Sequence, residues 1–107
     1  MIMFRQPTDI ETFEDHYNNL LALIERMPLI QRRQVIHSLG SPSGIARYYR
    51  ILEIYFTSEA DLRQALGSPQ GQESAGELSR FETDFDLLMA EVFEEMGGST
   101  AQGNPQL

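Results

Sequence analysis

Apolar and polar residues follow a strand-like pattern between Arg47 and Ser58. This run is rich in aromatic and β-branched side chains and contains neither glycine nor proline, which predicts a β-strand. Both faces of such a strand would carry large apolar groups, so each face needs a covering layer. Alternation would place Tyr48, Arg50, Leu52, Ile54 and Phe56 on one face, and Tyr49, Ile51, Glu53 and Tyr55 on the other.

A helical pattern comes earlier in the chain, after a short strand predicted from Met1 to Arg5. Apolar residues there recur at spacings of three and four, which predicts one amphipathic helix that ends before Pro28. Thr8 and Glu11 fit a capping box, in which hydroxyl and carboxylate satisfy the first free amides of the helix. The apolar stripe consists of Ile10, Phe13, Tyr17, Leu20, Leu21, Ile24 and Met27.

A second strand is predicted between the helix and Arg47. Gln31 to Leu39 alternates, and residues 40–44 read Gly-Ser-Pro-Ser-Gly, which is typical of a turn. The two flanking strands are therefore expected to form an antiparallel hairpin.

Two short helices and a last strand complete the pattern. Ser58 caps the first helix, and Ser68 with Pro69 opens the second. Thr83 to Met96 contains good helix formers but also alternates with a period of two. We predict a strand there, because a fourth strand completes a known arrangement.

The order βαββαβ predicts an α+β, ferredoxin-like fold with a four-stranded antiparallel sheet and helices on one face. We expect one domain over residues 1–96 and a flexible tail over 97–107, which is polar and contains glycine. The opposite face of the sheet would expose more apolar side chains than a soluble monomer usually shows. A second copy of the chain is the simplest cover, so we predict a homodimer with a cavity between its sheets.

Composition narrows the function classes. The 107 residues carry a net charge of −8 and no cysteine, which argues against nucleic-acid binding and excludes disulfides and thiol nucleophiles. No apolar run approaches the roughly 18 residues of a membrane span, and no signal peptide is recognised, so a cytoplasmic protein is expected. Two histidines in distant elements and the lack of a phosphate-binding loop give no reason to expect a metal or a cofactor.

Glu53 is the leading candidate for chemistry. A carboxylate within an apolar strand must be paired or hydrogen-bonded, or its pKa must rise, and such a group can serve as a general acid or base. The alternative is a structural bond to Arg47, Arg50 or a backbone amide. The other catalytic candidate is His37, which we expect the hairpin to bring near Glu53. The alternative is a structural or solvent-facing role.

Three tyrosines are candidates for substrate binding. Tyr49 and Tyr55 are expected on the same face as Glu53, where they would donate hydrogen bonds to a ligand while their rings form a wall. Tyr17 joins them from the helical stripe. For each of the three, packing in the core or at the dimer interface is the alternative interpretation.

Several short motifs stand out along the chain: Phe4-Arg5-Gln6-Pro7, Phe13 with His16-Tyr17, Met27-Pro28, Tyr48-Tyr49-Arg50-Ile51, Glu53-Ile54-Tyr55-Phe56 with Ser58, Ala65-Leu66 and Ser68-Pro69-Gln70-Gly71. Taken in order, over roughly residues 3–95, they resemble those of EthD domains. The resemblance implies a dimeric α/β barrel. The protein after which the EthD family is named belongs to bacterial degradation of an ether fuel additive. Relatives by fold include cofactor-free monooxygenases, isomerases and dehydratases.

Two functions follow from this resemblance. The first is a cofactor-free enzyme of catabolism or tailoring that acts on a small apolar organic molecule. The second is a non-catalytic dimer that binds such a molecule or assists another enzyme. EthD domains often carry a His-x-Pro-Leu motif after the tyrosine matched by Tyr17, and the run Asn18 to Ile24 lacks that histidine and proline. This departure adds weight to the second function, but the enzyme stays our first hypothesis.

Overall fold

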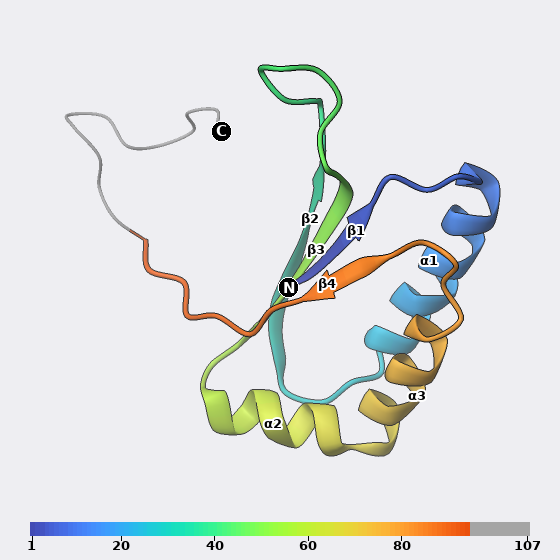
Figure 1. Ribbon diagram of the computed structural model, residues 1–107. Coiled ribbons are helices and arrows are strands. Elements are labelled where there is room, and N and C mark those ends of the chain that lie inside the picture. The colour runs from blue at the N-terminus through green and yellow to red at the C-terminus, as the bar shows by residue number, and fades with distance from the viewer. Residues whose placement is uncertain (95–107) are drawn as a thin grey trace.

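The computed structural model describes residues 1–94, which form a four-stranded antiparallel sheet in the order β2-β3-β1-β4, with helices on one side (Figure 1). The α+β, ferredoxin-like prediction is confirmed. The helical segment after β3 is divided into two helices, as predicted. The elements are β1 (Ile2–Arg5), α1 (Ile10–Ile24), β2 (Ile30–His37), β3 (Tyr48–Phe56), α2 (Glu59–Gly67), α3 (Pro69–Leu78) and β4 (Phe85–Leu87).

An aromatic core lies between the sheet and the helices. Phe4 is completely buried, and its ring centre lies 5.2 Å from that of Phe13 on α1 and 5.0 Å from that of Phe81 after α3. Aromatic pairs of this kind add about 0.5–1.5 kcal/mol each beyond their buried area. The predicted stripe forms the helical side of this core, except that Ile10 is 56% exposed.

The N-cap of helix α1 lies one residue later than predicted, at Asp9 and not at Thr8. The carboxylate of Asp9 accepts hydrogen bonds from the backbone amide and the hydroxyl of Thr12, so Asp9 is the N-cap and the Thr8 capping box is wrong. Aspartate serves this position as well as serine or threonine does. The predicted caps of the other two helices are confirmed, since Ser58 accepts from the amide of Asp61 and Ser68 from that of Gly71.

A β-bulge in β3 changes which way its first side chains point. Phe4 of β1 pairs with Arg50 and Arg5 pairs with Tyr48, which leaves Tyr49 as an extra residue. The Tyr49 ring therefore faces the helices, where its centre lies 5.3 Å from that of Phe13. Tyr48 takes the opposite face, so the predicted alternation is wrong for these two tyrosines.

Strand β4 is much shorter than predicted. It pairs with β1 through Phe85–Leu87 only, and residues 88–94 adopt neither the predicted strand nor the helical alternative. The reason is that β1 has four residues and offers no partner for a longer strand. Residues 95–107, with the predicted domain boundary and tail, lie outside the described residues.

Candidate functional site

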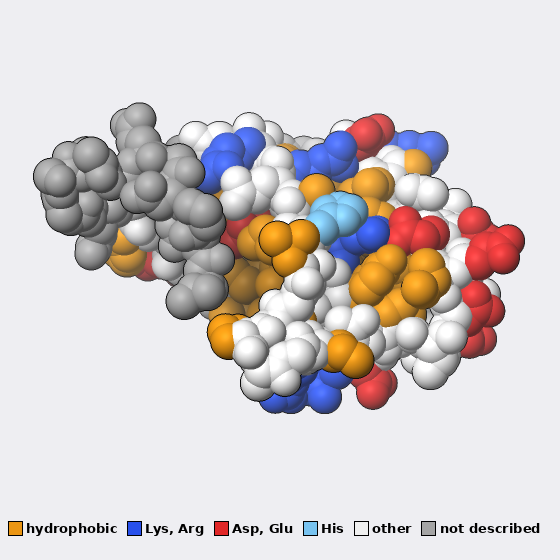
Figure 2. Space-filling model, turned by 90° about the horizontal axis from the view of Figure 1, so that it is seen from above, with side chains coloured by type: hydrophobic (Ala, Val, Ile, Leu, Met, Phe, Trp, Pro, Cys, Tyr) orange, Lys and Arg blue, Asp and Glu red, His pale blue; other side chains and the backbone are white. Residues whose placement is uncertain are grey.

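The sheet face turned away from the helices, called the open face below, has an apolar row flanked by polar groups. Ile36 pairs with Ile51, and Ile51 with Met3, across three strands. Ile36 is 42% exposed, so the described residues do not cover this row. Seen along the strands, acidic side chains gather on the side of the helices, while hydrophobic side chains surface in the middle of the view (Figure 2). The open face comprises Met3, Arg5, Arg32, Gln34, Ile36, Tyr48, Ile51, Glu53, Tyr55 and Asp86.

Glu53 lies on the open face in a small polar network. Its carboxylate accepts a hydrogen bond of 2.6 Å from Nε2 of Gln34, whose Oε1 accepts one of 2.8 Å from Arg32. The Arg32 guanidinium lies 3.9 Å from the ring centre of Tyr55. Partial burial and the Glu53 carboxylate raise the pKa of Tyr55, so its hydroxyl stays protonated at neutral pH and can donate a hydrogen bond. Glu53 is thus bonded to the side-chain amide of Gln34. The structural interpretation of Glu53 had expected Arg47, Arg50 or a backbone amide in that place.

A second polar network occupies the other end of the open face and was missed in the sequence. Asp86 Oδ2 accepts hydrogen bonds from the hydroxyl of Tyr48 at 2.9 Å and from Arg5 at 3.2 Å. The Tyr48 hydroxyl, followed by Arg5, holds the pKa of Asp86 below its usual value. Strict alternation places Tyr48 on the wrong face, so this network could be found only once the bulge was known.

The remaining predicted residues lie on the helix-covered side of the sheet. His37 is the register partner of Arg50, which faces the helices, so the expected His37–Glu53 pair is wrong because the two side chains take opposite faces. Tyr49 is turned away from Glu53 by the bulge. Tyr17 is 5% exposed and packs in the core. Of the five predicted residues, only Glu53 and Tyr55 come together.

An open groove lies on that helix-covered side, between α1 and the outer strand β2. Its cavity volume is about 170 Å³. Strand β2 extends past the cover of the helices there, and Val35 is 45% exposed for this reason. The groove is lined by Tyr17, Leu21, Arg33, Gln34, Val35 and Leu52.

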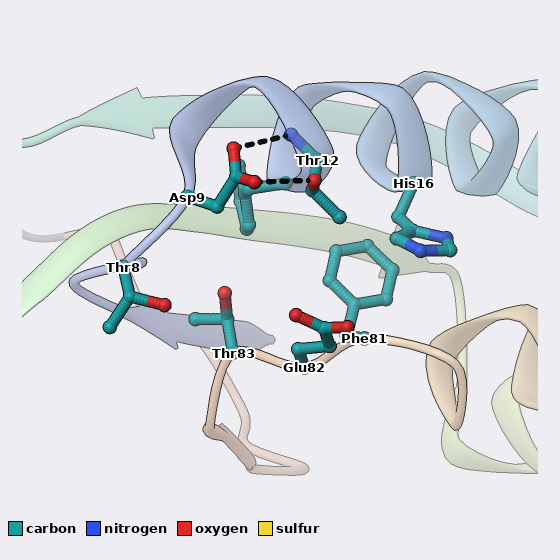
Figure 3. A pocket seen from close by; sticks show the side chains of 8 residues that line it. Thr8, Asp9, Thr12, His16, Phe81, Glu82 and Thr83 are labelled. Carbon is teal, nitrogen blue, oxygen red and sulfur yellow. Dashed lines mark hydrogen bonds between the residues drawn. The ribbon is translucent and has the colours of Figure 1, made fainter.

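A smaller hollow lies at the start of α1 (Figure 3). Its cavity volume is about 10 Å³, which is at most the space of one water molecule. The His16 ring beside it lies 5.5 Å from that of Phe81, and Nδ1 of His16 lies 3.2 Å from the buried carboxylate of Glu77. These contacts join α1 to α3, so we assign His16 a structural role.

Two further findings concern residues 1–94. They contain no group of three or more histidine, aspartate or glutamate side chains that could hold a metal ion. None of their helices is long and apolar enough to cross a membrane.

Comparisons with known proteins give two similar chains, and no family model matches the sequence. An uncharacterized 11.0 kDa protein in the thcB-thcC intergenic region of Rhodococcus erythropolis is 27% identical over 81 residues, which cover 75% of this chain and 79% of the relative. The crystal structure of an EthD family protein from Bacillus halodurans matches with a TM-score of 0.71 and 26% identity. That match covers 82% of this chain and 94% of the other.

Proposed function

Because the chain is an EthD-like protein in sequence and fold, we propose that it is a cofactor-free enzyme of small-molecule catabolism or tailoring. Two copies would pack their open faces together as a homodimer, and the substrate would lie between the sheets. Glu53 would act as the general acid or base, with Tyr55 orienting the substrate.

The observation that supports this proposal most is the position of Glu53. Its carboxylate lies on the open face beside the apolar row, and its hydrogen bond comes from the neutral amide of Gln34. Among residues 1–94 Glu53 forms no direct ion pair, although its charge acts on the Met1 ammonium. A carboxylate outside a direct ion pair can take a proton from a bound molecule. The proton would pass from a carbon or oxygen of the substrate to Glu53, while the Tyr55 hydroxyl would donate a hydrogen bond to the oxygen on which negative charge develops.

The uncovered apolar row supports the dimer. Ile36, Ile51 and Met3 form a continuous strip across three strands, and contiguous apolar surface of this kind usually marks an interface or a binding site. The polar networks that flank the strip would then line the space between the two sheets on either side of it.

A non-catalytic dimer that binds a small molecule is the second candidate. The absence of the His-x-Pro-Leu motif from α1 favours it. In such a protein Glu53 and Gln34 would hold a ligand oxygen or a ligand amine without moving a proton.

Native mass spectrometry of the protein as purified from cells tests the proposal. We expect a dimer that carries an additional small mass, because a cavity closed between two sheets retains its ligand. A monomer would contradict the arrangement on which the proposed site depends.

The retained compound, once identified, allows a test of Glu53. Incubation with wild-type protein should convert it, whereas Glu53→Gln, which keeps the shape but removes the base, should lower the rate at least about a hundredfold. Glu59→Gln, on exposed α2, is the matched control and should leave the rate unchanged. Binding without conversion by the wild-type protein would favour the non-catalytic alternative.

A further inference from the structure

We infer that the groove between α1 and β2 is a second ligand site, which takes a benzene-sized apolar molecule bearing one neutral, hydrogen-bond-accepting oxygen. The groove lies on the helix-covered side of the sheet, whereas Glu53 lies on the open face. The two sites lie on opposite faces of the sheet and share only Gln34, which donates to Glu53 and also lines the groove. The groove lies within a single copy of the chain.

The hydroxyl of Tyr17 is the feature that indicates a ligand. Tyr17 is 5% exposed and lines the groove, yet among residues 1–94 its hydroxyl has no hydrogen-bond partner. The oxygen is not sealed from the surface either, because it is absent from the fully buried polar atoms without a partner. The hydroxyl therefore reaches the groove without a partner from the described residues, and it can donate a hydrogen bond to a ligand oxygen that enters there.

The walls of the groove determine the size and polarity of the rest of the ligand. Leu52, which is 2% exposed, forms a closed floor, and Leu21 and Val35 form apolar sides. The cavity volume of about 170 Å³ is close to the roughly 150 Å³ of an apolar cavity that binds benzene. One six-membered ring therefore fills the available space.

The charges around the groove favour a neutral oxygen over a carboxylate. Arg33 is the cation of the lining, and its Nη2 lies 3.0 Å from Oε1 of Glu25, while its Nη1 donates to the carbonyl of Leu21 at 3.4 Å. Its charge is thus already matched. Burial raises the pKa of Tyr17, so the phenol stays protonated and donates. A cyclic ketone combines these properties.

Methyl NMR of the full chain tests this inference, with cyclohexanone as the probe and benzene as a probe without an oxygen acceptor. We expect both to shift the methyl signals of Leu21, Val35 and Leu52, with millimolar or tighter affinity for molecules of this size. The methyls of Ile36 and Ile51 report on the open face. Shifts confined to those two, or no shifts at all, would overturn the inference.

Tyr17→Phe separates the hydroxyl from the packing of the ring. The substitution breaks no hydrogen bond among the described residues, so the fold should persist. Affinity for cyclohexanone should fall about two- to tenfold, and affinity for benzene should not change. Tyr55→Phe on the open face is the matched control. It should leave the affinities read from the Leu21, Val35 and Leu52 signals unchanged, whatever it does to the signals of Ile36 and Ile51. Equal cyclohexanone affinity in wild type and Tyr17→Phe would show that the hydroxyl does not bind the ligand.

This test is independent of the proposed catalytic function. Glu53 contributes nothing to the groove, so Glu53→Gln should bind both probes as the wild type does. Loss of the catalytic proposal would leave the groove intact, and loss of the groove would leave Glu53 in place.

Discussion

Arg50 shows how strongly the tertiary environment changes the role of a single residue. It is 6% exposed, and its guanidinium lies 4.6 Å from the ring centre of Tyr17 and 5.1 Å from that of Tyr49. Its Nη1 lies 2.7 Å from Oε1 of Glu14. A buried charge is tolerated only when it is paired, and Glu14 provides the pairing here.

Glu14→Gln should therefore lower the stability of the folded protein. The amide keeps the shape of the side chain but removes the negative charge from a buried cation, and we expect the free energy of unfolding to fall by about 1–3 kcal/mol. Urea unfolding measures the change. Glu59→Gln is the matched control, because Glu59 pairs with Arg63 on the exposed side of α2, where such pairs contribute about 0.3–0.5 kcal/mol. Equal losses in the two variants would contradict the role of the Arg50–Glu14 pair.

The corner between α2 and α3 shows what one glycine does at the scale of elements. Gly71 and Gly76 both lie within α3. In the structure, a Cβ atom at Gly71 would lie 2.2 Å from the carbonyl oxygen of Ala65 and 2.6 Å from that of Leu66, whereas one at Gly76 would meet nothing within 4 Å. Gly71 is therefore required for the close approach of the two helices, whereas Gly76 is not.

The two glycines should respond to alanine with opposite signs. Gly71→Ala must push one helix away from backbone atoms that cannot rotate aside, at a cost of about 1–3 kcal/mol in the free energy of unfolding. Gly76→Ala should raise that free energy by about 0.5–1 kcal/mol, since alanine is the better helix former. Thermal and urea unfolding of both variants would measure this. A stabilised Gly71→Ala protein would mean that the corner is looser than described.

At the scale of the whole molecule, the open face is the main apolar surface that the described residues leave uncovered. Helices cover one side of the sheet only (Figure 1), and the Met3–Ile51–Ile36 row has no cover among residues 1–94. The proposed homodimer would bury this row, and obligate homodimers typically bury about 2,000 Å² or more in total.

Ile51→Asp tests the assembly. A charge in the middle of the row would have to be buried in the dimer, so we expect unfolded or aggregated protein in analytical ultracentrifugation. Leu39→Asp is the control, because Leu39 is 103% exposed in the hairpin loop, and it should behave as the wild type does. A soluble, folded monomeric Ile51→Asp protein, or an unchanged dimer, would count against burial of the open face.

Local signals in the sequence determined most of the elements. The helical stripe with Phe13 and Leu20, the caps at Ser58 and Ser68, and the alternation of β3 each depend on residues a few positions apart. The order of these elements was enough to predict the ferredoxin-like sheet and to place Glu53 with Tyr55 on one face. The motif resemblance to EthD domains agreed with the structural similarity found later.

Contacts between distant segments decided the rest. The bulge at Tyr49 depends on the pairing of β3 with β1, which lies more than forty residues earlier in the chain. That single extra residue separates Tyr49 from Glu53, and it joins Tyr48 to Asp86 from the far end of the sequence. The length of β4 likewise depends on how much of β1 is there to pair with. The sequence by itself therefore determined the elements and their order, while only the tertiary structure decided which side chains share a face, because register and bulges arise from strand pairing across the chain.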